Sequence, residues 1–232
     1  MIERDAYVEL ERWKKQKSRP ALLVDGARQV GKTFLVREFA KKNYGTVVEI
    51  NFTETPAAKS IFDGNLDPDT LIPLISASSG TVLVPGDTLV FLDEIQECPR
   101  ARTAIKFLVD DGRFDYIESG SLLGVTYEDV PSLPVGYERE LRMYPLTFRE
   151  FCQALGDHRV AFDVARDCFT RRAAVPEAVH ARLMELFVYY LVVGGMPAAV
   201  SCFAETRDLA RVLQVQKDIV TLYRKDIARY AR

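Results

Sequence analysis

The sequence has few of the residues that build cysteine or histidine metal sites, and no apolar run of membrane-spanning length. Of its 232 residues, two are histidines and four are cysteines, and no two cysteines form a C-x-x-C pair. We therefore expect no Cys/His metal site and no disulfide framework, which favours a reducing compartment. The longest apolar run covers residues 186–193. A bilayer span needs roughly 20 apolar residues.

The chain also lacks a strong overall charge, internal repeats and low-complexity segments. Its formal net charge is −2, so no overall field attracts nucleic acid or an anionic membrane. Glu3, Arg4 and Asp5 stand where a secretory signal would have an apolar core. The expectation is a cytoplasmic protein without a membrane partner, and the sequence indicates no nucleic-acid partner.

Apolar runs and amphipathic segments alternate through the first part of the chain. Residues 1–18 are predicted to form a helix. Short segments at 21–24, 46–52, 89–92, 114–117 and 137–143 are predicted strands, and those at 21–24 and 89–92 are continuous apolar runs. Helical periodicity occupies 32–42 and 99–111. This alternation predicts a parallel, doubly wound α/β sheet.

The pattern changes near Pro145, after which every segment is predicted to be helical. Thr147 and Glu150 form a capping box at the start of the first of these helices. The predicted boundaries are therefore an α/β domain over residues 1–145 and a helical lid over 146–232.

An apolar stripe at 209–227 lies in a basic segment, since residues 207–232 hold seven Lys/Arg and three Asp/Glu, a local charge of +4. The stripe predicts an interface with a second protomer or another protein through the C-terminal helix. The alternative is packing on the helix at 183–191.

Residues 26–33 match the pattern G-x-x-x-x-G-K-[ST] at every fixed position, between an apolar strand and an amphipathic helix. Such a loop wraps a phosphate with its backbone N–H groups, and the helix that follows adds its positive end. Lys32 is expected to reach the β- and γ-phosphates, and Thr33 to bind Mg²⁺. The alternative is a glycine-rich turn before a helix. The predicted ATP- or ADP-binding residues are Gly26, Ala27, Arg28, Gln29, Val30, Gly31, Lys32, Thr33 and Phe34.

Two acids, Asp93 and Glu94, end the predicted strand at 89–92. The carboxyl ends of parallel strands face the ligand crevice. Asp93 is expected to hold Mg²⁺ and Glu94 to activate the attacking water. Alone, such a pair is more typical of a solvated turn or helix cap, but the loop at 26–33 favours the catalytic interpretation.

Ser119-Gly120-Ser121 follows the fourth predicted strand, which should lie next to the strands that carry the two motifs above. A hydroxyl there could contact the γ-phosphate or the attacking water. A plain strand-to-loop turn fits the sequence equally well.

Together, the segments at 26–33, 93–96, 120–124, 134–136, 144–151 and 194–197 make the chain resemble a prokaryotic group of AAA-type P-loop ATPases. These proteins carry a C-terminal domain of unknown function, number 4143. The resemblance implies a five-stranded parallel sheet with helices on both faces, followed by a helical lid. It also implies that Ser121 is a catalytic sensor beside Lys32 and Glu94, and that Pro197 contacts the adenine. For residues 194–197, a simple helix break is the alternative.

Two features depart from that group. Its members usually have a basic residue after the glycine of P-V-G, where this chain has Tyr137, so neither Arg139 nor Arg142 is assigned as an arginine finger. Similar proteins also continue well beyond residue 230, and the expectation is that most of their C-terminal region is missing here. The sequence favours Mg²⁺-dependent ATP hydrolysis coupled to lid movement. The alternative is a nucleotide-dependent switch or scaffold with little turnover.

Overall fold

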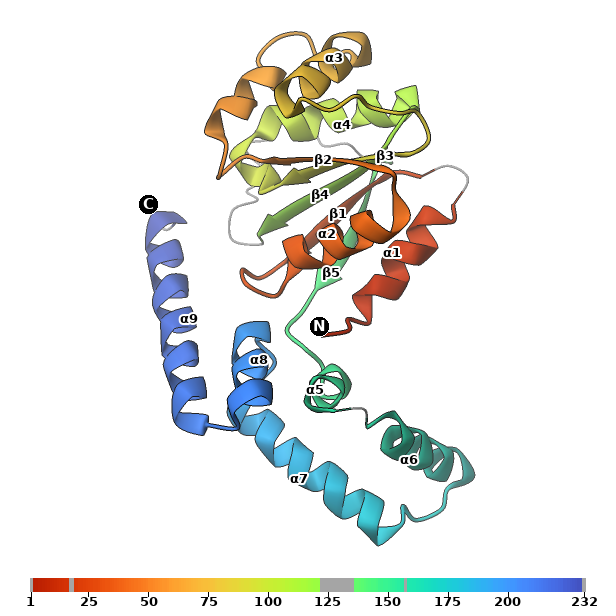
Figure 1. Cartoon of the computed structure of the whole chain (residues 1–232), viewed down its shortest axis with the longest axis vertical. Helices are drawn as coiled ribbons and strands as arrows, with labels where there is room; N and C mark the ends of the chain where they lie inside the picture. The colour runs from red at the N-terminus through yellow and green to blue at the C-terminus, as the bar shows by residue number, and fades with distance from the viewer. Residues whose placement is uncertain (1, 17–18, 122–135, 157, 231–232) are drawn as a thin grey trace. The chain divides into compact units, whose positions relative to one another are not determined.

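A computed structural model describes residues 2–16, 19–121, 136–156 and 158–230. The chain forms two compact units (Figure 1). The first is Ala6–Met143, and the second combines the first five residues with Tyr144–Arg232. Residues 122–124 and 134–135 of the segments compared above lie outside the described residues.

The first unit is built on a five-stranded sheet. Its strands are β1 Ala21–Gly26, β2 Thr46–Asn51, β3 Thr88–Asp93, β4 Asp115–Ser121 and β5 Glu138–Met143. They lie in the order β2-β3-β4-β1-β5, and every pairing is parallel. Every residue of β1 and β3 is buried, which explains their continuous apolar sequences, because helices cover both faces of such a sheet. The predicted α/β fold with a five-stranded parallel sheet is confirmed.

Helices α1 (Ala6–Lys14) and α2 (Lys32–Asn43) cover one face of the sheet, and α3 (Pro68–Ser79) and α4 (Pro99–Asp111) cover the other (Figure 1). Two short 3₁₀ helices, η1 (Pro56–Phe62) and η2 (Ile95–Glu97), precede α3 and α4. On the α1/α2 face, Phe39 packs its ring against Tyr7, Trp13 and Tyr44. The opposite core includes Leu71, Leu92 and Ile105.

The second unit is entirely helical in the residues that the structure describes. It contains α5 (Phe148–Leu155), α6 (Arg159–Arg171), α7 (Glu177–Val193), α8 (Pro197–Thr206) and α9 (Leu209–Tyr230). The capping box is present, because Thr147 Oγ1 accepts from Glu150 N and Glu150 Oε2 accepts from Thr147 N. Phe151, Leu186 and Phe203 lie in the core of this unit.

Two local predictions were wrong. The N-terminal helix covers Ala6–Lys14 rather than 1–18: Arg4 and the backbone N–H of Asp5 bond to the Glu150 carboxylate of the second unit. At the other end, the helix stops at Lys14, whose carbonyl accepts a hydrogen bond from the Arg19 guanidinium. Ser119–Ser121 is not a turn after the fourth strand. These residues are its last three, because they continue the parallel pairing with β1 up to Gly26.

Candidate functional site

The loop between β1 and α2 requires glycine at two positions. Gly26 has φ 151°, and a Cβ there would lie 2.3 Å from the carbonyl oxygen of Met143 on β5. Gly31, with φ 94°, is the residue from which α2 starts. Both backbones lie in the region that favours glycine. The spacing of the two glycines in the sequence therefore reflects a close approach to β5 and a helix start.

Lys32 is buried, with 6% of its surface exposed, although lysine is normally exposed. Its ammonium donates to the carbonyl oxygens of Gly26 and Ala27, each at 3.0 Å, so the side chain curls back over the loop. Burial lowers the pKa of Lys32, while the nearby carboxylates of Glu94, Asp25 and Asp93 oppose that change. The first turn of α2 thus places the Lys32 ammonium on the inner side of the loop.

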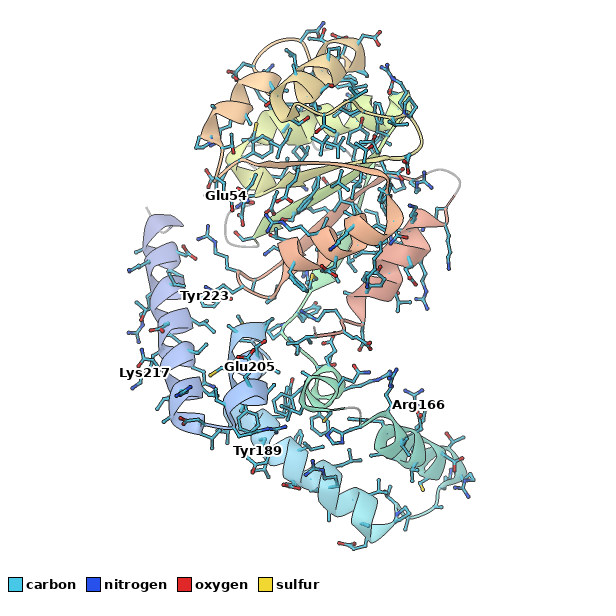
Figure 2. All side chains as sticks on the ribbon, in the orientation of Figure 1. Glu54, Arg166, Tyr189, Glu205, Lys217 and Tyr223 are labelled. Carbon is cyan, nitrogen blue, oxygen red and sulfur yellow. The ribbon has the colours of Figure 1, made fainter. Side chains whose placement is uncertain are left out.

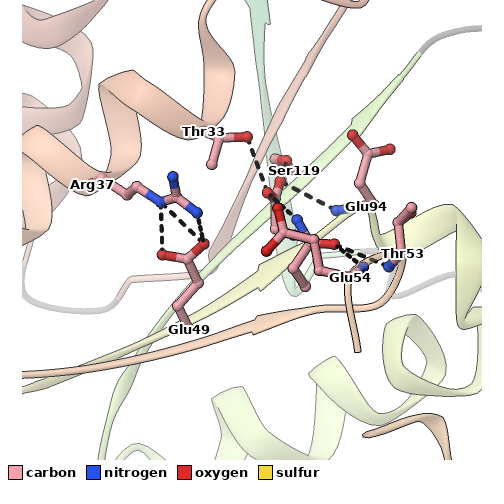
Figure 3. Close-up of polar contacts among 9 residues, drawn as sticks. Thr33, Arg37, Glu49, Thr53, Glu54, Glu94 and Ser119 are labelled. Carbon is pink, nitrogen blue, oxygen red and sulfur yellow. Dashed lines mark hydrogen bonds and ion pairs between the residues drawn. The ribbon is translucent and has the colours of Figure 1, made fainter. Parts of the chain in front are cut away.

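Asp93, at the end of β3, is the centre of a polar network, and Figure 3 shows Thr33, Glu94 and Ser119, which contribute to it. Its Oδ2 accepts from Thr33 Oγ1 at 3.0 Å and from Asn51 Nδ2 at 2.9 Å. Its Oδ1 accepts from the Ser119 hydroxyl and from the Glu94 backbone N–H. Three strands and the start of α2 therefore converge on one carboxylate, which is 1% exposed.

The pair Thr33 and Asp93 fits a magnesium ion. Mg²⁺ prefers oxygen ligands in octahedral geometry at about 2.1 Å, so adjacent ligands lie about 3 Å apart. Thr33 Oγ1 and Asp93 Oδ2 are 3.0 Å apart. The described residues contain no group of three or more His, Cys, Asp or Glu side chains that could hold a metal. Two protein oxygens are enough for Mg²⁺ that is bound together with phosphates.

Glu94 follows Asp93 with a backbone in the left-handed region, φ 57° and ψ 47°. This conformation turns the chain sharply from β3 into η2. The Glu94 carboxylate accepts a hydrogen bond from Gln96 Nε2. Figure 3 shows the Glu94 side chain near the Asp93 network, with Thr53 and Glu54 of the loop after β2 nearby.

The two serines at the end of β4 have different surroundings. Ser119 bonds to Asp93, whereas Ser121 pairs in register with Gly26 at the start of the loop. Ser121 is 1% exposed, and its hydroxyl has no hydrogen-bond partner among the described residues. The sensor role assigned to Ser121 remains a prediction, and Ser119 is the serine that the structure joins to the acidic centre.

Asn51 belongs to the site but was not identified from the sequence. Its amide donates to Asp93, and its Oδ1 accepts from the backbone N–H groups of Thr53 and Glu54, both at 2.9 Å. The sequence feature that could have identified Asn51 is that it is a polar residue at the end of a predicted strand, as Asp93 is. Without the pairing of β2 with β3, nothing in the sequence places Asn51 opposite Asp93.

The two arginines on β5 have acidic partners within the first unit. Arg142 lies 2.7 Å from Glu140 and 3.5 Å from Asp25, and Arg139 lies 3.8 Å from Glu9. Asp25 directly precedes the loop, and burial raises the pKa of its carboxyl group. These contacts leave the arginine finger unassigned.

The residues predicted to lie in the lid belong to the second unit. Pro197 is the first residue of α8. Gly195 lies against the chain before α5: its carbonyl accepts from Leu146 N at 2.6 Å, and a Cβ on it would lie 2.4 Å from Leu146 O. Residues 194–197 thus form a packed junction between two helices. Their contact with adenine remains a prediction.

The stripe on α9 divides into buried and exposed residues. Val212 and Ile219 are buried in the second unit, whereas Leu213, Val220 and Ile227 are about half exposed. Lys217 lies on the exposed surface of the same helix (Figure 2). Packing within the second unit therefore accounts for part of the stripe, and the alternative of packing on the helix at 183–191 remains a prediction. None of the described helices has both the length and the hydropathy to span a membrane.

Comparison with known proteins identifies the family. The protein-family model described as an AAA domain matches residues 18–152, and a domain of unknown function (DUF8612) matches residues 184–232. The resemblance had implied domain of unknown function 4143 instead. No curated protein matches.

Among solved structures, PCH-2 from C. elegans has a TM-score of 0.45 at 12% identity, with 90% of this chain and 64% of that chain covered. AMPPCP-bound DnaA from Aquifex aeolicus has a TM-score of 0.46 at 13% identity, with 97% of this chain and 67% of that chain covered. This chain thus spans about two thirds of either length. Since the family model covers more than half of the residues, the chain belongs to the AAA domain family.

Proposed function

We propose that this protein binds ATP with Mg²⁺ and hydrolyses it at the end of the sheet where β1, β3 and β4 meet. Membership of the AAA domain family supports the proposal. The observation that carries it is the 3.0 Å distance between Thr33 Oγ1 and Asp93 Oδ2. Thr33 directly follows the buried Lys32 in the sequence. A helix start, a cation and two oxygen ligands together suit a magnesium-bound polyphosphate.

In this proposal, the backbone N–H groups of residues 26–33 and the start of α2 surround the phosphates, with Phe34 at the border of the site. The ammonium of Lys32 exchanges its two loop carbonyls for phosphate oxygens, which are stronger acceptors because they carry charge. Thr33 and Asp93 would hold Mg²⁺, which neutralises phosphate charge during the reaction.

Glu94 acts as the general base in the hydrolytic step. The water oxygen forms a bond to the γ-phosphorus, and the water proton moves to the Glu94 carboxylate. The bond from the γ-phosphorus to its bridging oxygen breaks, and that electron pair leaves on ADP. Lys32 stabilises the charge on the γ-phosphate. The hydroxyl of Ser121, at the end of β4, contacts the γ-phosphate or the attacking water.

Movement of the second unit completes the proposed cycle. Pro197 and the glycines before it would contact the base, and the exposed residues of α9 would contact a second protomer or another protein. These two proposals rest on the helix junction at 194–197 and on the half-exposed apolar side chains of α9.

Nucleotide binding is tested by calorimetry with ATP in the presence and absence of Mg²⁺. Lys32→Ala should lose most of the binding, since a hydrogen bond to a charged group contributes about 1.5–3 kcal/mol. Lys41→Ala, which removes an exposed lysine from the last turn of the same helix, is the matched control and should bind like the parent. Equal affinity of the Lys32 variant and the control would refute the proposed phosphate site.

A further inference from the structure

Glu94 is fixed in space by its backbone. Both neighbours are buried, since Asp93 is 1% exposed and Ile95 is 0% exposed. The Glu97 N–H donates to the Glu94 carbonyl at 2.9 Å, which closes the turn. A left-handed conformation is unfavourable for a non-glycine residue, and it often marks a functional position. The direction of the Glu94 side chain is therefore set by anchors on both sides.

The carboxylate at the end of that side chain is bonded by Gln96. Gln96 Nε2 donates to Glu94 Oε2, and in the described part of the chain no other hydrogen bond reaches this carboxylate. Oε1 of Glu94 consequently remains available as an acceptor. Gln96 thus holds one carboxylate oxygen of Glu94, and the other has no hydrogen-bond partner among the residues that the structure describes.

The hydrogen bond from Gln96 to Glu94 leaves the oxygen of the same amide in an unfavourable environment. Gln96 Oε1 is buried and has no hydrogen-bond partner among the described residues. Leaving a buried polar atom unpaired destabilises the folded state. Turning the amide over would place its oxygen against the Glu94 carboxylate, and two acceptors cannot bond. The orientation of the amide thus serves Glu94 rather than the stability of the turn.

We infer that Gln96 is a positioning residue for the general base. It holds Oε2 of Glu94 and directs the free Oε1 to take the proton from the attacking water. This inference rests on the proposed hydrolysis, because it assigns Gln96 a role only through Glu94. Gln96 itself contacts neither nucleotide nor water in this role.

The test measures single-turnover phosphate release and ATP affinity for the whole chain. Gln96→Leu, which removes the donor, should lower the rate about 10- to 100-fold and leave the dissociation constant for ATP within about threefold. Gln96→Glu, which places a second carboxylate beside the first, should lower the rate at least as much. Glu97→Gln alters the next residue, which pairs with Lys59, and should keep the parent rate.

A second variant separates positioning from a general structural effect. In a Glu94→Gln background, Gln96→Leu should change the residual rate by less than about twofold, because residues that act as a unit are not additive. Circular dichroism and thermal unfolding confirm folding, and Gln96→Met replaces Gln96→Leu if the leucine variant does not fold.

Three results would overturn the inference while leaving the proposed function intact: a parent-like rate for Gln96→Leu, an equal fractional loss in both backgrounds, or a loss of ATP affinity as large as the loss of rate. Absence of phosphate release by the parent protein would overturn the proposed hydrolysis together with this role.

Discussion

Glu118 lies in the middle of β4, between Leu23 on β1 and Leu92 on β3. It is fully buried, and neither carboxylate oxygen has a hydrogen-bond partner among the described residues. Nearby, Arg102 on α4 bonds to both carboxylate oxygens of Glu138, at 2.8 and 3.0 Å. Burial raises the pKa of Glu118 well above its usual value, and the charge of Glu138 adds to this, whereas Arg102 opposes it. We expect Glu118 to be protonated when the protein is folded.

This proton makes the stability of the first unit depend on pH. In the unfolded chain Glu118 ionises near its ordinary pKa, so from about pH 5 upward the folded state binds one more proton than the unfolded state. Because the pKa of Glu118 is raised in the folded state, its contribution to the free energy of unfolding is complete at low pH and is lost as the pH rises. The loss is about 1.4 kcal/mol per pH unit for as long as the folded carboxyl group keeps its proton.

Glu118→Gln removes this ionisation and keeps the shape of the side chain. The variant should have nearly the parent stability at pH 4.5, and its advantage over the parent should grow by about 1.4 kcal/mol per pH unit above pH 5. Urea unfolding followed by the fluorescence of Trp13 reports on this unit, because Trp13 is the one tryptophan and is buried there. Parallel pH profiles of the parent and the variant would refute the argument.

Three further substitutions test other parts of the structure. Gly26→Ala should abolish ATP binding and destabilise the first unit, since its Cβ would meet the Met143 carbonyl; unchanged calorimetry and melting temperature would contradict this. Asn51→Ala removes one bond to Asp93 and two to backbone N–H groups, and about 2–3 kcal/mol of stability should be lost in urea titrations. Pro197→Ala should weaken ATP binding without changing the chemical step, and an unaltered dissociation constant for ATP would count against the lid contact.

The fold was predictable from the sequence where local pattern and tertiary structure agree. The continuous apolar runs at 21–24 and 89–92 predict strands buried on both faces, as β1 and β3 are, and all five predicted strands are present. The glycine before α2 and the capping box at Thr147 are also local, because each meets a backbone requirement of its own segment. Such features need no knowledge of the rest of the chain.

Contacts between distant segments were not predictable. The role of Asn51 depends on the register of β2 against β3, and that of Ser119 on the pairing of β4 with β3. The sequence contained all three residues of Ser-Gly-Ser, yet only the strand pairing shows which serine bonds to Asp93. Likewise, the N-terminal helix is shortened by Glu150, whose carboxylate is 146 positions away from Arg4 along the chain. Hydrogen bonds of this kind depend on the folded topology rather than on local periodicity.

In the proposed mechanism, Glu94 activates water at an ATP site formed by Lys32, Thr33 and Asp93. The decisive experiment compares single-turnover phosphate release at saturating ATP and Mg²⁺ between the parent and Glu94→Gln. We expect the variant to bind ATP with parent-like affinity and to release phosphate about 10²- to 10⁴-fold more slowly. Equal rates in the two proteins would contradict it.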